Sequence, residues 1–342
     1  MITVRVPLGE RSYDVVVGHG ARRELASLLP STAKRAAIVT QRAISLDIDV
    51  GLPTEVFMIG EGEVHKSLAT IEALCRGFAR FGLTRNDVVI GVGGGMVTDV
   101  AGFAAATWHR GVPVVHVSTT LVGMVDAAIG VKTGVNLAAV NGIGGKNLVG
   151  AFWQPAGVVC DLDALATLPA REVRCGRGEM AKYHFLTGDD LLARDETERI
   201  ARCVEIKAEF VSSDERESGR RALLNYGHTL AHALEIATDY ALAHGEAVAI
   251  GLIYAATLAC QLRRIDQARV DQHYDVVGGL YELDTALPDG VDRRELIESM
   301  GRDKKALGGG LTFVLDGANG VEVVTGVSPE AAAEALDTMM LR

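Results

Sequence analysis

The chain has 342 residues, of which 48% are hydrophobic, so it is long enough for one large domain or two ordinary ones around a packed core. Its net charge of −10, without a cluster of Lys and Arg, excludes a nucleic-acid backbone as the expected partner. Because the N-terminus has no basic segment followed by a long apolar run, and no apolar stretch reaches membrane-spanning length, we expect a cytoplasmic protein without a membrane partner.

Short runs rich in β-branched residues alternate with helical patterns in the first half of the chain. These strand-like runs cover residues 13–17, 35–40, 55–58, 88–92 and 114–118. Strands separated by helices are typical of a mainly parallel sheet with helices on its faces. We therefore predict a Rossmann-like α/β domain over residues 1–160, with binding residues at the carboxyl ends of its strands.

The pattern changes after Asp161, where segments rich in Ala and Leu with helical spacing dominate. The clearest of these segments are 191–212, 221–237 and 246–262. Two short β-like runs, 311–315 and 321–324, precede a last helix that Ser328 is suited to cap. The second half is therefore predicted to be a mainly α-helical domain over residues 161–342.

A glycine-rich turn follows the strand-like run that ends near Val92. Gly93, Gly94 and Gly95 lead into a helical pattern, so backbone N–H groups there can approach a pyrophosphate closely. A tight turn without a ligand is the other interpretation, since the pattern is not the usual dinucleotide fingerprint. The polar segment 61–66 offers acceptors for ribose hydroxyls and a cation, and a solvated loop is its alternative.

A second polar region extends from Ser118 to Asn147. It contains the hydroxyl groups of 118–120, the carboxylate of Asp126 and two lysines, Lys132 and Lys146, among glycines. Such groups bind phosphate and polyol oxygens, because charge-assisted hydrogen bonds to anions are strong. The region therefore indicates a phosphorylated-sugar site, with an exposed loop of ordinary lysines as the alternative.

The helical half carries five polar residues at alternating spacings of four and three. They are Arg221, Asn225, His228, His232 and Glu235. In one continuous helix this spacing places all five on one face. A solvent-facing stripe usually contains Lys and Glu, whereas this one contains two histidines, an asparagine and an arginine, so we favour the wall of a cleft. Two histidines alone are a weak metal signal, and Glu179 and His244 are the candidate further ligands.

Several collinear motifs between about residues 61 and 305 closely resemble the 3-dehydroquinate synthase family, a branch of the sugar-phosphate cyclases. The motifs are Gly-Gly-Gly-Met-Val-Thr-Asp-Val-Ala-Gly-Phe from Gly93, Ser-Thr-Thr-Leu from Ser118, Lys-Thr-Gly-Val-Asn from Lys132, Gly-Lys-Asn from Gly145, Leu-Asn-Tyr-Gly-His-Thr from Leu224 and His-Gly-Glu-Ala-Val from His244. Their combination is far more specific than any one of them.

The resemblance implies an NAD-dependent lyase that converts 3-deoxy-D-arabino-heptulosonate 7-phosphate to 3-dehydroquinate and phosphate in the shikimate pathway. Transient oxidation by NAD, phosphate elimination, reduction, ring opening and an intramolecular aldol closure make up the implied reaction. Glu179, His228 and His244 match the metal ligands of the family, for zinc or cobalt. The first domain then binds NAD, and the second binds the metal ion and the phosphorylated sugar-acid substrate.

The resemblance also assigns further site residues by position. Cofactor-binding residues are Glu61, Gly62, Glu63, Val64, His65, Lys66, Gly94, Gly95, Met96, Val97, Thr98, Asp99, Thr119, Thr120, Asp126, Lys132, Lys146, Ala164, Leu165, Ala166 and Thr167. Catalytic and substrate-contacting residues are Lys132, Asn147, Lys182, Lys207, Arg221, Asn225, His232, Arg110 and the pair Lys304 and Lys305. In the family the arginine that matches Arg110 crosses a dimer interface, so a homodimer is expected.

Four departures from the family pattern stand near the expected ligands, and one of them is a slight lengthening of the segment 141–144 before Lys146. Gln41-Arg42 replaces an Asp and an Asn that often contact the adenosine end, and Gly178 stands where the family commonly has Ala. Ile129-Gly130-Val131 replaces the usual double glycine before Lys132. Related cyclases of the valiolone or inosose type, a metal-dependent polyol dehydrogenase, and an inactive binding protein on the same scaffold are the alternative functions.

Overall fold

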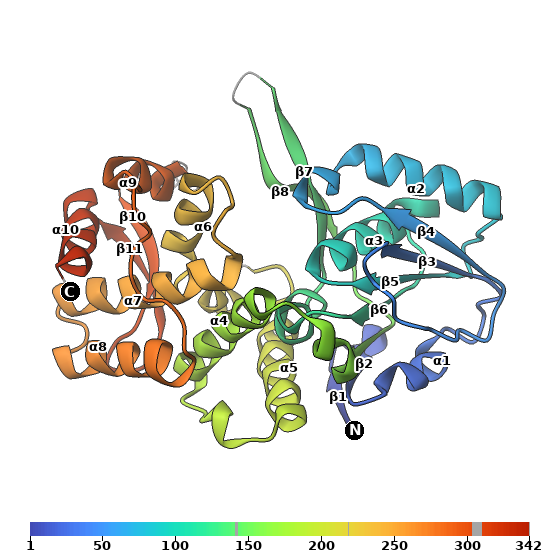
Figure 1. The fold of residues 1–342 in the computed structure, drawn as a ribbon, viewed down its shortest axis with the longest axis horizontal. Helices are drawn as coiled ribbons and strands as arrows, with labels where there is room; N and C mark the ends of the chain where they lie inside the picture. Colours follow the sequence, from blue (N-terminus) through green and yellow to red (C-terminus); the bar gives the residue numbers. More distant parts are fainter. Residues whose placement is uncertain (141–142, 218, 303–309, 342) are drawn as a thin grey trace. The chain divides into compact units, whose positions relative to one another are not determined.

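The computed structural model describes residues 1–140, 143–217, 219–302 and 310–341. The chain forms two compact units (Figure 1), the first made of Met1–Pro169 and Arg194–Arg216, the second of Ala170–Ala193 and Glu217–Arg342. This division differs from the expected boundary after residue 160. The chain enters the second unit at Ala170 and then returns, because helix α5 (Glu196–Ser213) packs against the N-terminal strands.

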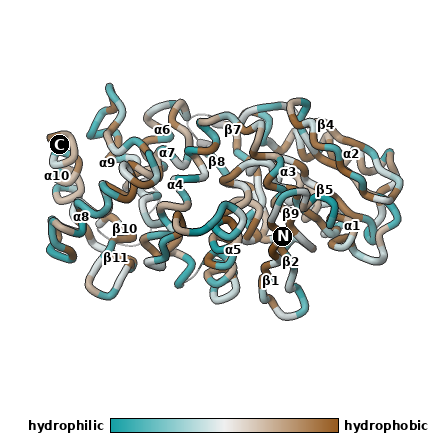
Figure 2. The backbone as a smooth tube through the Cα atoms, turned by 60° about the horizontal axis from the view of Figure 1, so that its bottom comes forward, coloured by the Kyte–Doolittle hydropathy of each residue, from teal (hydrophilic) through white to brown (hydrophobic). Residues whose placement is uncertain are grey.

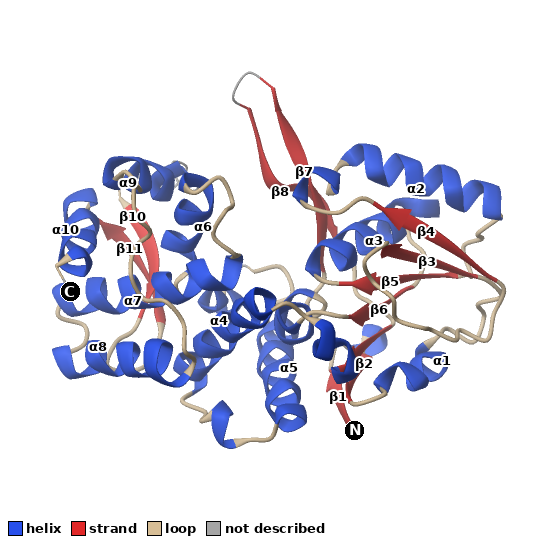
Figure 3. Cartoon of the chain, viewed as in Figure 1, coloured by secondary structure: helices blue, strands red, loops and turns tan. Residues whose placement is uncertain are grey.

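A seven-stranded sheet forms the centre of the first unit (Figure 3). Its strands are β1 (Ile2–Val6), β2 (Tyr13–Gly18), β3 (Ala36–Gln41), β4 (Thr54–Ile59), β5 (Val88–Gly93), β6 (Val114–Ser118) and β9 (Gly157–Asp161). The strand order is β1-β2-β9-β6-β5-β3-β4, and only the β1–β2 pair is antiparallel. The predicted mainly parallel sheet is confirmed, while β1 and β9 had not been predicted.

Apolar side chains alternate between the two faces of this sheet. Ala37 and Val39 of β3 belong to a core that includes helices α2 (Leu68–Phe81) and α3 (Gly95–Thr107), whereas Ile38 points into a second core with α1 (Leu25–Leu28). Both faces are therefore covered, as a parallel sheet of Val-rich strands requires. Ser67 caps α2 by accepting a hydrogen bond from the Thr70 backbone N–H, and Gly82 ends that helix with a φ of 71°.

The polar region after Ser118 forms a long hairpin instead of a loop. Strands β7 (Lys132–Val140) and β8 (Ile143–Phe152) pair antiparallel and project beyond the sheet of the first unit (Figure 1). The register shifts twice along the pair, between Val135 and Leu137 and between Leu137 and Val140. These irregularities twist the ribbon and change which side chains share a face.

The second unit is mainly helical, as predicted. Its helices are α4 (Ala170–Thr187), α6 (His228–Ala237), α7 (His244–Gln261), α8 (Gln267–Tyr274), α9 (Arg293–Arg302) and α10 (Pro329–Met340). Helix α7 packs against α4, α6, α8 and α10, and its apolar run is visible in the hydropathy colours of Figure 2. The pair β10 (Leu311–Leu315) and β11 (Glu322–Val327) is antiparallel, and Ser328 caps α10 as expected.

The expected continuous helix over residues 221–237 is wrong. A 3₁₀ turn covers Arg220–Asn225, and α6 begins only at His228, so the five polar residues between Arg221 and Glu235 do not lie on one helical face. Gly227 has a φ of 81°, which a glycine adopts without the steric penalty that other residues carry. The chain therefore turns immediately before His228.

Among the described residues, no helix combines the length and apolarity that crossing a membrane requires.

Candidate functional site

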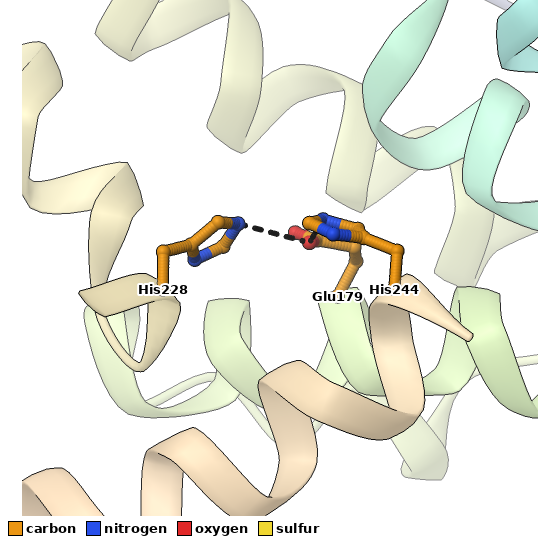
Figure 4. A group of neighbouring side chains, drawn as sticks. All are labelled: Glu179, His228 and His244. Carbon is orange, nitrogen blue, oxygen red and sulfur yellow. Dashed lines mark hydrogen bonds and ion pairs between the residues drawn. The ribbon is translucent and has the colours of Figure 1, made fainter. Parts of the chain in front are cut away.

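Three side chains from three different helices converge in the second unit (Figure 4). Glu179 comes from the middle of α4, His228 is the first residue of α6, and His244 is the first residue of α7. One potential ligand atom from each residue lies within 4.8 Å of the others. The Nε2 atoms of His228 and His244 lie 3.4 and 3.2 Å from Oε1 of Glu179. The triad expected from the sequence is therefore brought together.

The opposite ring nitrogens of the two histidines face hydrogen-bond acceptors. Nδ1 of His228 lies 3.1 Å from the Tyr226 carbonyl oxygen, and Nδ1 of His244 lies 3.5 Å from Oε2 of Glu235. Because both partners only accept, each Nδ1 carries the proton and donates it. An Nε2 atom without a proton would therefore direct its lone pair toward the Glu179 carboxylate. Lone pairs and a carboxylate repel one another unless a proton or a metal ion lies between them.

Burial and charge set the protonation of these groups. Burial alone would raise the pKa of Glu179, but the Lys182 ammonium and the two imidazoles hold it well below its usual range. For His244 burial lowers the pKa, yet hydrogen bonds to Glu179 and Glu235 outweigh it and raise the pKa to about 10. With this pKa, His244 carries a proton at neutral pH that a metal ion would have to displace. One carboxylate and two imidazoles are a donor set that suits Zn²⁺ or Co²⁺ and leaves coordination positions for substrate.

Glycines next to the three ligands allow their helices to approach closely. A Cβ atom at Gly178 would overlap the Gly245 carbonyl oxygen, and one at Gly245 would overlap that of Cys175. In the same way, a Cβ atom at Gly251 of α7 would overlap the carbonyl oxygen of Gly227. The backbones of α4, α6 and α7 therefore meet beside Glu179, His228 and His244, and this contact sets the spacing of the ligands.

A buried polar group supports the segment that carries His228. The Tyr226 hydroxyl lies 2.8 Å from Nε2 of His273, whose Nδ1 donates to the Arg269 carbonyl oxygen at 2.8 Å. The ring of Phe185, from the same helix as Glu179, stacks on His273 with centroids 3.8 Å apart. Burial lowers the pKa of His273 to about 4, so its Nε2 accepts from Tyr226 and holds the residue whose carbonyl oxygen orients His228.

A second charged group lies in the first unit. The Lys66 side chain, only 6% exposed, places Nζ 2.6 Å from Oδ2 of Asp99 and 2.6 Å from Oδ1 of Asn147. Asn136 joins the surrounding segments, because its Oδ1 accepts from the Asn147 backbone N–H and its Nδ2 donates to Glu63. The polar segment 61–66, the start of α3 and the hairpin thus meet through side-chain hydrogen bonds.

Lys207 of α5 belongs to the first unit. Its side chain is 7% exposed, and Nζ lies 2.8 Å from Oδ1 of Asp126. The sequence had assigned Lys207 to the substrate and Asp126 to the cofactor, and the structure pairs the two. Asp126 does not begin a long helix, since it lies within the short π-helical turn Gly123–Ala127.

The glycine-rich turn connects β5 to α3 as predicted. Gly94 is the N-cap of α3, and a Cβ atom there would lie 2.8 Å from Cγ2 of Thr120. The Thr119 backbone N–H donates to the Gly93 carbonyl oxygen at 3.0 Å, which links this turn to the end of β6. The N-terminus of α3 therefore suits a phosphate group, since helix N-termini attract anions.

The other predicted site residues are distributed over both units. Glu61, Gly62, Val64 and His65 are exposed, and Met96, Val97 and Thr98 form the first turns of α3 after Gly95. Lys132 and Lys146 lie on the two strands of the hairpin. A 3₁₀ turn contains Ala164, Leu165, Ala166 and Thr167. Arg110 is exposed and has a φ of 66°. Arg221 is buried, Asn225 donates to Glu217, and the exposed His232 ring lies 5.5 Å from that of His228. Lys304 and Lys305 lie outside the described residues.

Two residues that contact the predicted site were not assigned to it from the sequence. Asn136 had been noted only as part of the lysine-rich region, and Glu235 only as part of a polar helical stripe. Their partners, Glu63 and His244, lie in other segments of the chain. The spacing of Glu235 seven residues after His228 was the one available signal, since it puts both side chains on the same side of α6.

Comparison with known proteins gives matches over nearly the whole chain. The family model described as 3-dehydroquinate synthase N-terminal matches residues 56–175, and the model described as 3-dehydroquinate synthase C-terminal matches residues 176–306. A protein of Amycolatopsis mediterranei (strain S699) with the provisional name aminodehydroquinate synthase is 52% identical, over 98% of this chain and 94% of that protein. A 3-dehydroquinate synthase of Mycobacterium leprae (strain TN) is 41% identical, over 92% and 91% of the two chains.

Solved structures of sugar-phosphate cyclases share the fold. A 2-deoxy-scyllo-inosose synthase in complex with carbaglucose-6-phosphate, NAD⁺ and Co²⁺ has a TM-score of 0.87 at 24% identity, and 99% of this chain and 100% of that chain are covered. The 2-epi-5-epi-valiolone synthase of Streptomyces hygroscopicus subsp. jinggangensis 5008, with NAD⁺ and Zn²⁺ bound, has a TM-score of 0.81 at 26% identity, with coverage of 96% and 97%.

Proposed function

Because this chain belongs to the 3-dehydroquinate synthase family, we propose that it is a lyase that converts 3-deoxy-D-arabino-heptulosonate 7-phosphate to 3-dehydroquinate and phosphate, with NAD and one divalent metal ion. Solved relatives were determined with NAD⁺ and either Co²⁺ or Zn²⁺, which supports the choice of cofactors. The proposed reaction is a step of the shikimate pathway, and we propose that the protein acts in the cytoplasm.

The orientation of the triad is the observation that supports this proposal most strongly. Two imidazoles with their protons held at Nδ1 direct both Nε2 atoms at one buried carboxylate. A polar stripe on a solvent-facing helix would not produce this arrangement. When bound there, the ion would polarise the substrate oxygens and lower the pKa of a coordinated hydroxyl group.

The remaining residues bind and orient the reactants. The α3 N-terminus and the exposed segment around Glu61 fit the phosphates and a ribose of the cofactor, and Lys66 is held beside them by Asp99. Buried Arg221 and Lys182 offer positive charge to the carboxylate and hydroxyl groups of the substrate, and Lys132, Lys146 and Lys207 offer it in the first unit. Catalysis then arises chiefly from fixed charges that hold the substrate in place.

We further propose a homodimer in which Arg110 reaches the site of the partner. Arg110 is exposed, and its φ of 66° follows a φ of 50° at His109, so the backbone there is held in an uncommon conformation. Sedimentation equilibrium tests the dimer. An Arg110→Ala variant mixed with an inactive His228→Ala variant should regain activity by subunit exchange if the arginine acts across the interface.

The test of the activity is a coupled product assay. Purified, metal-loaded protein with NAD and the heptulosonate phosphate should release phosphate and 3-dehydroquinate in equal amounts, without net formation of NADH. A metal-dependent polyol dehydrogenase would accumulate NADH, and a valiolone- or inosose-type cyclase would turn over its own sugar phosphate instead. Absence of every product would indicate an inactive binding protein on this scaffold.

A second candidate substrate is the amino analogue of the heptulosonate phosphate. It is favoured by the 52% identity to the protein named as an aminodehydroquinate synthase, against 41% to the 3-dehydroquinate synthase of M. leprae. Competition between the two substrates at equal concentration measures the ratio of kcat/KM directly. A ratio above one for the hydroxyl substrate supports the main proposal, and a ratio below one assigns the amino substrate.

A further inference from the structure

We infer that Glu235 is a positioning residue of the metal centre, which holds His244 with Nε2 directed at the ion. The inference rests on the proposed metal ion and extends to a residue outside the three expected ligands. Oε2 of Glu235 lies 3.5 Å from Nδ1 of His244, while Nε2 of the same ring lies 3.2 Å from Oε1 of Glu179. The imidazole therefore lies between two carboxylates, one at each nitrogen.

The position of Glu235 excludes a role as a fourth ligand. The two nitrogens of an imidazole point in divergent directions, so a carboxylate that accepts from Nδ1 lies behind the ring as viewed from the ion. Consistent with this, the atoms that converge within 4.8 Å come from Glu179, His228 and His244 among the described residues. Glu235 acts on the ion only through His244.

Helix α6 couples the two histidine ligands through this residue. His228 begins the helix and Glu235 follows two turns later, on the same side. The helix thus supplies one ligand directly and orients the other, which belongs to α7. Any movement of α6 relative to α7 would disturb both ligands at once.

The acceptors of the two histidines differ in charge. His228 donates to the neutral carbonyl oxygen of Tyr226, whereas His244 donates to a carboxylate whose residue is only 7% exposed. A carboxylate behind a histidine fixes its tautomer and makes its other nitrogen a stronger metal ligand. Removal of such a partner typically weakens metal affinity by about 10- to 100-fold.

The experiment measures the dissociation constant for Co²⁺ by competition with a chromogenic chelator. Glu235→Leu removes the acceptor at similar size and should weaken Co²⁺ binding by about 10- to 100-fold, whereas Glu235→Gln keeps an acceptor and should lose less than about tenfold. Glu246→Gln is the matched control, since Glu246 lies on α7 beside His244 but bonds to the Ala243 N–H, Arg171 and Arg174. Its affinity for Co²⁺ should stay at the wild-type value.

Equal affinity of Glu235→Leu and wild type would overturn the inference. If the Leu variant fails to fold, ¹⁵N chemical shifts of the metal-loaded wild type decide the matter, because the inference requires a proton on Nδ1 of His244 and the ion on Nε2. Metal bound at Nδ1 would contradict it. A wild-type chain that binds no Co²⁺ would instead refute the metal centre of the proposed function, which is a different outcome.

Discussion

The cluster around Lys66 and the cluster around Glu179 differ in one respect, which is whether the charges of each are neutralised by other side chains of the same cluster. In the first unit, the ammonium of Lys66 is matched by Asp99 and Asn147, each 2.6 Å from Nζ. In the second unit, one oxygen of Glu179 pairs with Lys182 while the other faces two imidazole nitrogens. The first cluster is complete without a ligand, whereas the second requires a proton or a metal ion.

This difference indicates separate roles for the clusters. A balanced ion pair with low exposure fixes local backbone geometry, here between the polar segment 61–66, α3 and the hairpin. An unbalanced set of donors binds a cation strongly because a cation relieves the repulsion among them. Changes in the first cluster should therefore lower the stability of its unit without weakening metal binding, and changes in the second should weaken metal binding.

The largest expected effect is the loss of a ligand. His228→Ala should bind no stoichiometric metal ion and should lose activity by on the order of 10³- to 10⁴-fold, because the ion supplies several kcal/mol of transition-state stabilisation. Phosphate release and metal content after dialysis measure the two effects. Exposed His232 provides a control, since His232→Ala should keep a full complement of metal. Equal metal content in wild type and His228→Ala would exclude this residue as a ligand.

Breaking the balanced cluster should leave the metal ion in place. Lys66→Met removes the partner of Asp99 and should lower the free energy of unfolding by about 3 kcal/mol. The pKa of Asp99 is already raised in the wild type, because burial outweighs the effect of Lys66. Urea denaturation measures this change, and the affinity for Co²⁺ should remain at the wild-type value. Adding Asp99→Asn should recover part of the loss, so a double variant less stable than the single one would contradict the balance described here.

Much of the fold could be predicted because local sequence determines it. The strands expected at 13–17, 35–40, 55–58, 88–92 and 114–118 are found with ends that differ by at most one residue. The single polar face from Arg221 to Glu235 was wrong because periodicity does not reveal that Gly227 adopts a φ of 81° and ends the preceding turn. The return of α5 to the first unit also has no local signal, since packing against β1 depends on tertiary contacts.

The sequence predicted which residues belong to the candidate site, but it did not predict which of these side chains contact one another. The family resemblance identified Glu179, His228 and His244, which converge as expected. It did not identify Glu235, because a carboxylate behind a ligand has no fixed spacing from it. The close approach of Gly178 to Gly245 also could not be predicted from the sequence, since each glycine alone is compatible with an ordinary helix.

A smaller effect should follow from separating the helices that carry the ligands. Gly245→Ala introduces a Cβ atom that overlaps the Cys175 carbonyl oxygen, and should cost about 2 kcal/mol of the free energy of unfolding together with some metal affinity. Gly279→Ala is the control, because no atom lies within 4 Å of a Cβ atom built there. Urea denaturation of both apo variants compares them, and equal stability would show that the helices tolerate the extra atom.

The smallest expected effect is the change in metal affinity over one pH unit. Since the pKa of His244 is raised to about 10 in the metal-free chain, the ion must displace a proton at neutral pH. The affinity for Zn²⁺ should therefore rise by about tenfold per pH unit between pH 6 and 8. The same shift stabilises the apo protein below the unfolded pKa, and this contribution disappears as the pH rises through the folded pKa. Competition titrations at several pH values measure the slope, and a flat profile would contradict the proton displacement.

X-ray absorption at the zinc edge of the purified, zinc-loaded protein tests the central claim most directly. One ion per chain should show two imidazole nitrogens at about 2.0–2.1 Å and a carboxylate oxygen at about 2.0–2.2 Å. Replacing His244 by Ala should remove one imidazole from the spectrum. A zinc ion surrounded by oxygen alone, or a spectrum unchanged in the His244→Ala variant, would show that Glu179, His228 and His244 do not form the metal centre.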